Sequence, residues 1–169
     1  MATPIRTRKV SHVVLNVSNM ERSIKFYTEL LGFQVTDTNE RGMVFLRNGT
    51  DHHTIAFAPA PPDATGAPRD KYTTLHHIAL EVDSVEDLFK AREFLKEHGI
   101  EFTYEGRRGA GCNAGIEFLD PDGFSLELTC QMEQIGWAGQ ARPHELHRPA
   151  KSLEEAVANP VPDWEPASV

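Results

Sequence analysis

The sequence is poor in cysteine and has no long apolar run. Its 169 residues include two cysteines, Cys112 and Cys130, which are not in CxxC spacing. This usage indicates a cytoplasmic protein with reduced thiols, although one disulfide stays compatible with the sequence. No apolar stretch approaches the roughly 20 residues that span a bilayer, so no membrane segment is expected. The N-terminus lacks an apolar segment followed by a cleavage site, so no secretory signal is expected either.

Positive charge is also scarce. Lysine and arginine together number 17 against 25 acidic residues, which gives a formal net charge of −8. This balance argues against nonspecific binding to nucleic acid or to an anionic membrane surface. The apolar content of 40% is enough for a hydrophobic core. The length suits one compact domain or two small modules that share a core.

The most informative feature that is present is an internal repeat. Residues 11–22 read SHVVLNVSNMER and residues 76–87 read HHIALEVDSVED. In both segments a histidine precedes three apolar residues, one polar residue, a valine and a polar cap, so that His12 falls on His77. Ser18 with Glu21, and Ser84 with Asp87, are predicted to cap the helix that follows.

The elements that follow the two histidines also correspond. Apolar residues at helical spacing predict helices that end at Gly32 and Gly99. Strand-like runs follow each helix, and they cover Phe33–Asp37, Met43–Arg47 and Thr54–Ala58 in the first half and Glu101–Tyr104, Ala114–Leu119 and Ser125–Cys130 in the second. Between the last two strands, Asp120–Gly123 is a turn signature. Each half therefore reads strand, helix, strand, strand, strand.

These patterns predict an α+β fold with a single domain over residues 1–133. It contains two βαβββ modules, residues 9–58 and 72–131, joined by a proline- and alanine-rich linker, residues 59–71. Residues 134–169 are rich in proline and charge and are expected to form an extended C-terminal tail. A capping pattern at Ser152 and Glu155 allows a short helix over residues 152–158. The tail is expected to lie along the surface and to cover an edge strand, a site mouth or a partner subunit.

Two histidines and a glutamate are the candidate metal ligands. His12 and His77 occupy equivalent repeat positions, so they become symmetry mates if the modules pack as pseudo-twofold copies. Glu127 lies between two leucines on an expected core strand, where a carboxylate is costly to bury without a partner. Two imidazoles and one carboxylate leave coordination positions open and suit Fe(II), and Mn, Zn, Ni or Co can also occupy such a site.

Further histidines lie close to these ligands in the sequence. His52 and His53 begin the strand that is the repeat counterpart of the strand bearing Glu127, so one of them is expected near the metal, as an acid/base or anion-stabilising group. His52 and His53 fit equally well in a loop that leads into the strand. His76 precedes His77 on the opposite strand face and is interpreted as a supporting or structural residue.

These residues resemble the vicinal oxygen chelate superfamily, which includes glyoxalases, epimerases, antibiotic-resistance proteins and type I extradiol dioxygenases. The resemblance covers residues 10–130, and its strongest segments are SIKFYTELLGF (23–33), LHHIALEV (75–82) and DPDGFSLEL (120–128). It implies paired βαβββ modules that form a curled mixed sheet around a metal. The ligand positions of the family match His12, His77 and Glu127.

Within the superfamily, residues 52–57 (HHTIAF) resemble the extradiol dioxygenase segment that carries a catalytic histidine, which would be His53. Glyoxalase-type relatives usually carry a fourth ligand on this strand, and Thr54–Ala58 contains no carboxylate or amide.

Two positions depart from the extradiol pattern. Glu117 stands where these enzymes commonly have a tyrosine, and residues 107–113 replace an upstream histidine. Arg107 or Arg108 is a candidate for binding a substrate carboxylate, or else lies in a solvated loop. Asn113 is a further candidate near the substrate. Glu117 is either a second carboxylate in the cavity or a solvent-facing residue.

The resemblance implies Fe(II)-dependent ring cleavage of a catechol, with a small aromatic diol and O2 as substrates and His53 as the catalytic residue. One alternative is a glyoxalase- or epimerase-type isomerase or lyase that recruits Glu117. Another is a noncatalytic, resistance-type protein that binds a small molecule. A homodimer or higher homo-oligomer is expected, because such sheets leave edges to cover.

Overall fold

The computed structural model describes residues 10–61, 75–108, 111–134 and 142–164. Outside these ranges lie residues 62–71 of the predicted linker, residues 72–74 and 109–110 of the predicted second module, and residues 135–141 and 165–169 of the predicted tail. The chain divides into two compact units. Unit one comprises Met1–Thr74 with Pro121–Gly123, and unit two comprises Leu75–Asp120 with Phe124–Val169. None of the described helices is long and apolar enough to cross a membrane.

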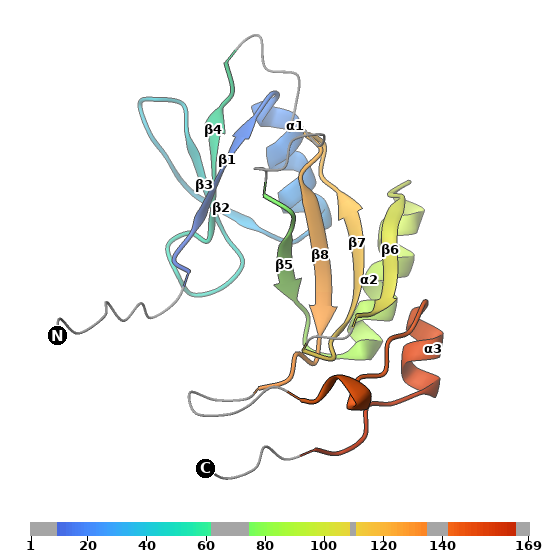
Figure 1. Cartoon of the computed structure of the whole chain (residues 1–169). Coiled ribbons are helices and arrows are strands. Elements are labelled where there is room, and N and C mark those ends of the chain that lie inside the picture. The colour runs from blue at the N-terminus through green and yellow to red at the C-terminus, as the bar shows by residue number, and fades with distance from the viewer. Residues whose placement is uncertain (1–9, 62–74, 109–110, 135–141, 165–169) are drawn as a thin grey trace, which may run out of the picture. The chain divides into compact units, whose positions relative to one another are not determined.

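Unit one carries the first copy of the repeat (Figure 1). Its elements are β1 (Val13–Val17), α1 (Met20–Lys25), the π-helical segment η1 (Phe26–Leu30), β2 (Gln34–Thr38), β3 (Val44–Arg47) and β4 (Ile55–Pro59). The sheet order is β1-β4-β3-β2. β1 runs parallel to β4, and the other pairs are antiparallel. Tyr27 is fully buried, with its ring edge-on to Phe57 at 4.9 Å between ring centroids.

Unit two repeats this topology (Figure 1). Its elements are β5 (Ile78–Glu81), α2 (Val85–Glu97), β6 (Phe102–Arg107), β7 (Ala114–Leu119), β8 (Ser125–Cys130), the 3-10 helix η2 (His144–Leu146) and α3 (Leu153–Ala158). The sheet order is β5-β8-β7-β6. β5 runs parallel to β8, and the other pairs are antiparallel. The predicted α+β class with two βαβββ modules is confirmed, and each module forms its own four-stranded mixed sheet.

The two faces of the sheet in unit two differ in chemistry because side chains alternate along each strand. Ile116, Phe118 and Leu126 are fully buried on one face, where α2 contributes the buried Leu88 and Leu95. The opposite face carries Glu117, Glu127 and Thr129. This face holds the candidate metal centre.

The first helix begins one residue later than its predicted cap implies. Asn19, not Ser18, is the N-cap, and its side chain accepts a hydrogen bond from the backbone N–H of Arg22. Ser18 instead donates its backbone N–H and its hydroxyl to Asp122, which also accepts from Ser23. The predicted Ser84 cap of α2 is confirmed, because its hydroxyl accepts from the N–H of Asp87.

The tail covers the edge strand of unit two. Ala150 forms an isolated antiparallel bridge with Arg107 at the end of β6. Gly106 permits this approach, because a Cβ there would lie 2.1 Å from the carbonyl oxygen of Ala150. α3 follows, capped by Ser152, and Glu154 pairs with Arg92 of α2 at 2.8 Å. Of the two alternatives given for Arg107, the solvated loop is wrong, because β6 extends to include Arg107 and the residue is buried.

Candidate metal centre

The register of unit two brings one histidine and two glutamates together. Glu117 of β7 lies directly opposite Glu127 of β8. β5 runs parallel to β8 with Ala79 beside Glu127, so His77, two residues before Ala79, lies on the same face. His77 Nε2 is 3.4 Å from Glu127 Oε2, and His77 Nδ1 is 3.9 Å from Glu117 Oε1. One ligand atom from each of the three residues lies within 4.8 Å of the others.

This cluster has the electrostatics of a cation site. The two glutamates are only 6% and 7% exposed. Burial raises the pKa of Glu127, and the negative charge of Glu117 adds to that rise, while His77 and Arg108 oppose it. Arg108 pairs with Glu117, but Glu127 is a buried carboxylate whose ionised form faces a second carboxylate, which is costly without a further positive charge. Oxygen and imidazole donors are those that divalent Fe, Mn and Zn accept. The donor set therefore fits a divalent metal.

A glycine leaves room for the Glu127 side chain. A Cβ at Gly115 would lie 2.5 Å from Glu127 Oε1 and 3.1 Å from the backbone oxygen of Leu128. Any larger residue at this position would force the carboxylate to move. The position of Glu127 thus depends on a neighbour that carries no chemistry of its own.

Arg108 and Tyr104 complete the surroundings of Glu117. The Arg108 guanidinium forms an ion pair with Glu117 and lies over the Tyr104 ring at 4.1 Å from its centroid. Burial raises the pKa of Tyr104. Glu117 is thus a second carboxylate beside His77 and Glu127, and the alternative of a solvent-facing residue is wrong. Asn113 donates its side-chain N–H to Thr129, two residues beyond Glu127 on the same face.

The remaining predicted histidines have different neighbours. In unit one, His12 and His53 have ring centroids 4.7 Å apart, and His53 Nδ1 is 3.0 Å from His52 Nδ1. Burial lowers the pKa of His53, and the nearby His12 and His52 lower it further, which favours its neutral form. In unit two, His76 is exposed, with its Nδ1 2.7 Å from His77 Nδ1. Metal ligation by His12 stays a prediction.

The two copies of the repeat differ at the carboxylate positions. In unit two Ala79, two residues after His77, pairs with Glu127. In unit one Val14, two residues after His12, pairs with Ala56. Ala56 is therefore the counterpart of Glu127. Phe45, which pairs with Ala56, is the counterpart of Glu117. Unit one thus has histidines at its repeat site but neither carboxylate.

Comparison with known proteins gives a family and two groups of relatives. The model of the Glyoxalase/Bleomycin resistance protein/Dioxygenase superfamily matches residues 9–128. A probable lactoylglutathione lyase of Vibrio parahaemolyticus is 32% identical over 132 residues, which cover 71% of this chain and 88% of that protein. Metapyrocatechase 2 of Cupriavidus necator is 29% identical over 139 residues, which cover 80% of this chain but 40% of that protein.

Among solved structures, a glyoxalase/dioxygenase from Nostoc punctiforme matches with a TM-score of 0.60 and 23% identity. The match covers 79% of this chain and all of that one. At this level of identity the likeness concerns the fold alone.

Proposed function

Because the chain belongs to the Glyoxalase/Bleomycin resistance protein/Dioxygenase superfamily, we propose that it is an Fe(II)-dependent extradiol dioxygenase that cleaves a catechol-type ring. The observation that carries this proposal is the asymmetry of the repeat. Ala56 stands at the position equivalent to Glu127. With no carboxylate there, the proposed ligand set is His12, His77 and Glu127. Three protein ligands leave room for a bidentate diol and for O2.

Bound Fe(II) would supply coordination positions for the diol and O2 and would relay electrons from the diol, which is oxidised, to O2. The chain's own groups hold and prepare the reactants. His77 Nδ1 lies 2.7 Å from His76 Nδ1, so His76 is suited to orient the His77 ring while Nε2 faces Glu127. Glu117 Oε1, at 3.9 Å from His77 Nδ1, places a second negative charge beside the ring. Arg108 in turn holds Glu117 through its ion pair.

His53 is the proposed proton acceptor. Its lowered pKa keeps the ring neutral near pH 7, so it can accept a proton from a substrate hydroxyl. Nδ1 faces His52, which leaves Nε2 as the nitrogen that would take this proton. After proton transfer the imidazolium would stabilise negative charge that develops on oxygen.

The experiment uses protein purified without oxygen, loaded with Fe(II) and mixed with a panel of catechols in aerated buffer. We expect O2 uptake and a yellow ring-opened semialdehyde in equal amounts. The variants His77→Ala and Glu127→Ala should lose their iron, and with it O2 uptake and semialdehyde formation. His12→Ala should have the same effects if His12 is a ligand. Absence of uptake and colour across varied catechols would refute ring cleavage.

A lactoylglutathione lyase-type isomerisation is the second candidate, and Glu117 is the observation that favours it. This reaction needs a carboxylate that moves a proton between adjacent carbons, and Glu117 lies beside His77 and Glu127. The match to the Vibrio lyase also spans most of that protein. Thioester formation from a 2-oxoaldehyde and glutathione by the Ni- or Zn-loaded protein under nitrogen, lost in Glu117→Gln, would favour this reaction. Tight ligand binding without turnover in either assay would favour the noncatalytic alternative.

A further inference from the structure

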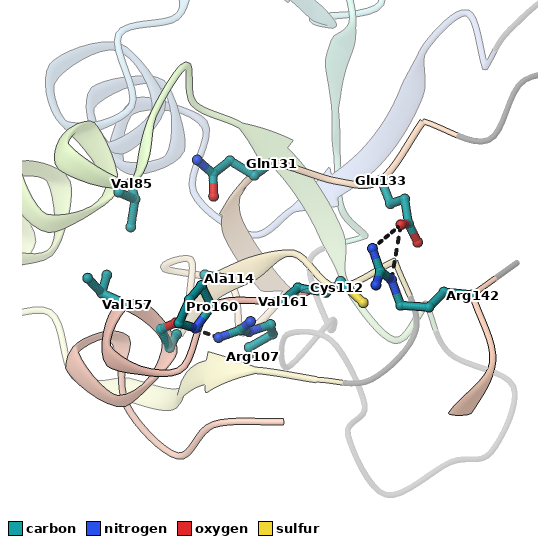
Figure 2. Close-up of a pocket in the computed structure, with 11 residues that line it drawn as sticks. Val85, Arg107, Cys112, Ala114, Gln131, Glu133, Arg142, Val157, Pro160 and Val161 are labelled. Atoms are coloured by element: carbon teal, nitrogen blue, oxygen red, sulfur yellow. Dashed lines mark hydrogen bonds and ion pairs between the residues drawn. The ribbon is translucent and has the colours of Figure 1, made fainter. Parts of the chain in front are cut away.

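Unit two contains a cavity on the face of its sheet opposite the metal cluster. Its volume is about 440 Å³, within the range of small-molecule sites. Ala114 of β7 contributes to its wall, and because side chains alternate, Ala114 and Glu117 point to opposite faces. Figure 2 shows that Val157, Pro160 and Val161 of the tail form another part of the wall. This cavity is therefore separate from the His77, Glu117 and Glu127 cluster.

A buried arginine lines this cavity, and no acidic group of the described residues pairs with it. Arg107 is 4% exposed. Its Nη2 donates to the backbone oxygens of Ala156 and Asn159, and within the described part of the chain its Nε has no hydrogen-bond partner. Burial lowers the pKa of Arg107, and the charge of Arg148 adds to this lowering. A guanidinium stays charged in proteins, so this is a buried cation whose partners among the described residues are neutral carbonyls.

The other polar groups of the cavity do not neutralise Arg107. Glu133 accepts from Arg142 Nε at 3.1 Å and from Arg142 Nη2 at 2.8 Å, so its charge is matched by that guanidinium (Figure 2). Burial raises the pKa of the Cys112 thiol, which is therefore uncharged near pH 7. The described residues that line the cavity therefore carry one excess positive charge, in a protein whose net charge is −8.

We propose that this cavity binds a small organic monocarboxylate with a short apolar body, whose carboxylate is the counter-ion of Arg107. A charge-assisted hydrogen bond to the guanidinium would satisfy the buried cation. The hydrocarbon part would pack against Ala114, Val157 and Val161. A single negative charge matches the single excess guanidinium, whereas a dianion such as inorganic phosphate would bring an unpaired charge against apolar walls. Because Arg107 also binds α3, the ligand should stabilise the tail.

The test measures binding of isovalerate and benzoate to the full chain by calorimetry, with isovaleramide and benzamide as uncharged analogues. We expect one carboxylate per chain, bound at least about tenfold more tightly than its amide. Val157 is 53% exposed at the cavity rim, so Val157→Glu and Val157→Gln form a matched pair that should both fold. Val157→Glu should weaken carboxylate binding at least about tenfold through like-charge repulsion, and Val157→Gln should not.

Further variants locate the anion. Arg107→Met should abolish carboxylate binding, and Arg41→Met, an exposed arginine of unit one, should leave it unchanged. If Arg107→Met fails to fold, the Val157 pair still decides the question. Equal binding to the two Val157 variants would overturn the proposal, and so would equal affinity for acid and amide. Binding that is lost in Glu127→Gln but kept in Val157→Glu would assign the anion to the metal cluster instead.

Discussion

Replacing Gly115 with alanine would push a methyl group against the carboxylate of Glu127. The new Cβ would lie 2.5 Å from Glu127 Oε1, closer than the 3.0 Å that real Cβ atoms keep, so the oxygen would have to move by about half an ångström or more. The new Cβ would also lie 3.1 Å from the Leu128 carbonyl oxygen, a close contact that a shift of a few tenths of an ångström relieves. Metal ligands tolerate displacements of only about 0.5 Å, so the effect should fall mainly on the metal.

The expected magnitudes follow from these contacts. Loss of ligand support typically lowers metal affinity about 10- to 100-fold, or about 1.4 to 2.7 kcal/mol. Overpacking should cost about 1 kcal/mol of unfolding free energy, at the low end of its usual range, because the far end of Glu127 can rotate away. The metal affinity should thus fall by more than the stability of the fold.

Fe(II) affinity would be measured anaerobically by competition with a chromophoric chelator, and stability by urea unfolding of the metal-free protein. Gly49→Ala is the matched control, because a Cβ at Gly49 meets no atom within 4 Å. If folded Gly115→Ala binds Fe(II) as tightly as Gly49→Ala does, Glu127 is not a ligand and the proposed centre is wrong.

Three further predictions concern other parts of the chain. His53→Ala should lower kcat for ring cleavage on the order of 100-fold while the iron content stays unchanged; a parallel loss of iron would contradict the proton-acceptor role. Asp122→Asn should destabilise the protein by about 1–3 kcal/mol at pH 7, measured by urea unfolding. Burial opposes ionisation of Asp122, but hydrogen bonds from Ser18 and Ser23 and the charge of Arg22 hold its pKa below the ordinary value. The difference between variant and parent should therefore shrink as pH falls below about 4, and a constant difference would argue against this linkage. Arg92→Ala should speed hydrogen exchange in α3, whereas Lys90→Ala should not. The hydrogen bond from Arg92 lowers the pKa of Glu154 to about 2, so in the parent this contact should weaken only as pH falls from about 4.5 towards 2.

The repeat made the topology predictable, because a histidine, a capped helix and three strands recur in the same order. The alternation of side chains along each strand also predicted which residues share a face of the sheet, so His77 and Glu127 could be expected to lie close together. The position of Glu117 depends on the register between β7 and β8, and composition does not reveal it. The turn does carry a signal: a hairpin symmetric about Asp122 pairs residue 117 with residue 127, as observed.

Other features depended on contacts between residues far apart in sequence. The burial of Arg107 could not be predicted, because its partners, Ala156 and Asn159, lie 49 and 52 residues further on. The choice of Asn19 over Ser18 as cap follows from Asp122, which takes up the Ser18 hydroxyl. No feature of the sequence around Arg107 or Ser18 indicates these distant partners.

The bridge between Ala150 and Arg107 has a practical consequence for how the protein can be shortened. The family match ends at residue 128, so an alignment would suggest cutting the chain soon after β8. Such a cut would remove Ala150 from the outer side of β6 and expose backbone groups that pair readily with other chains. It would also take away both carbonyl acceptors of the Arg107 guanidinium. The shortened protein should therefore aggregate, although every strand and helix of the two modules would still be encoded.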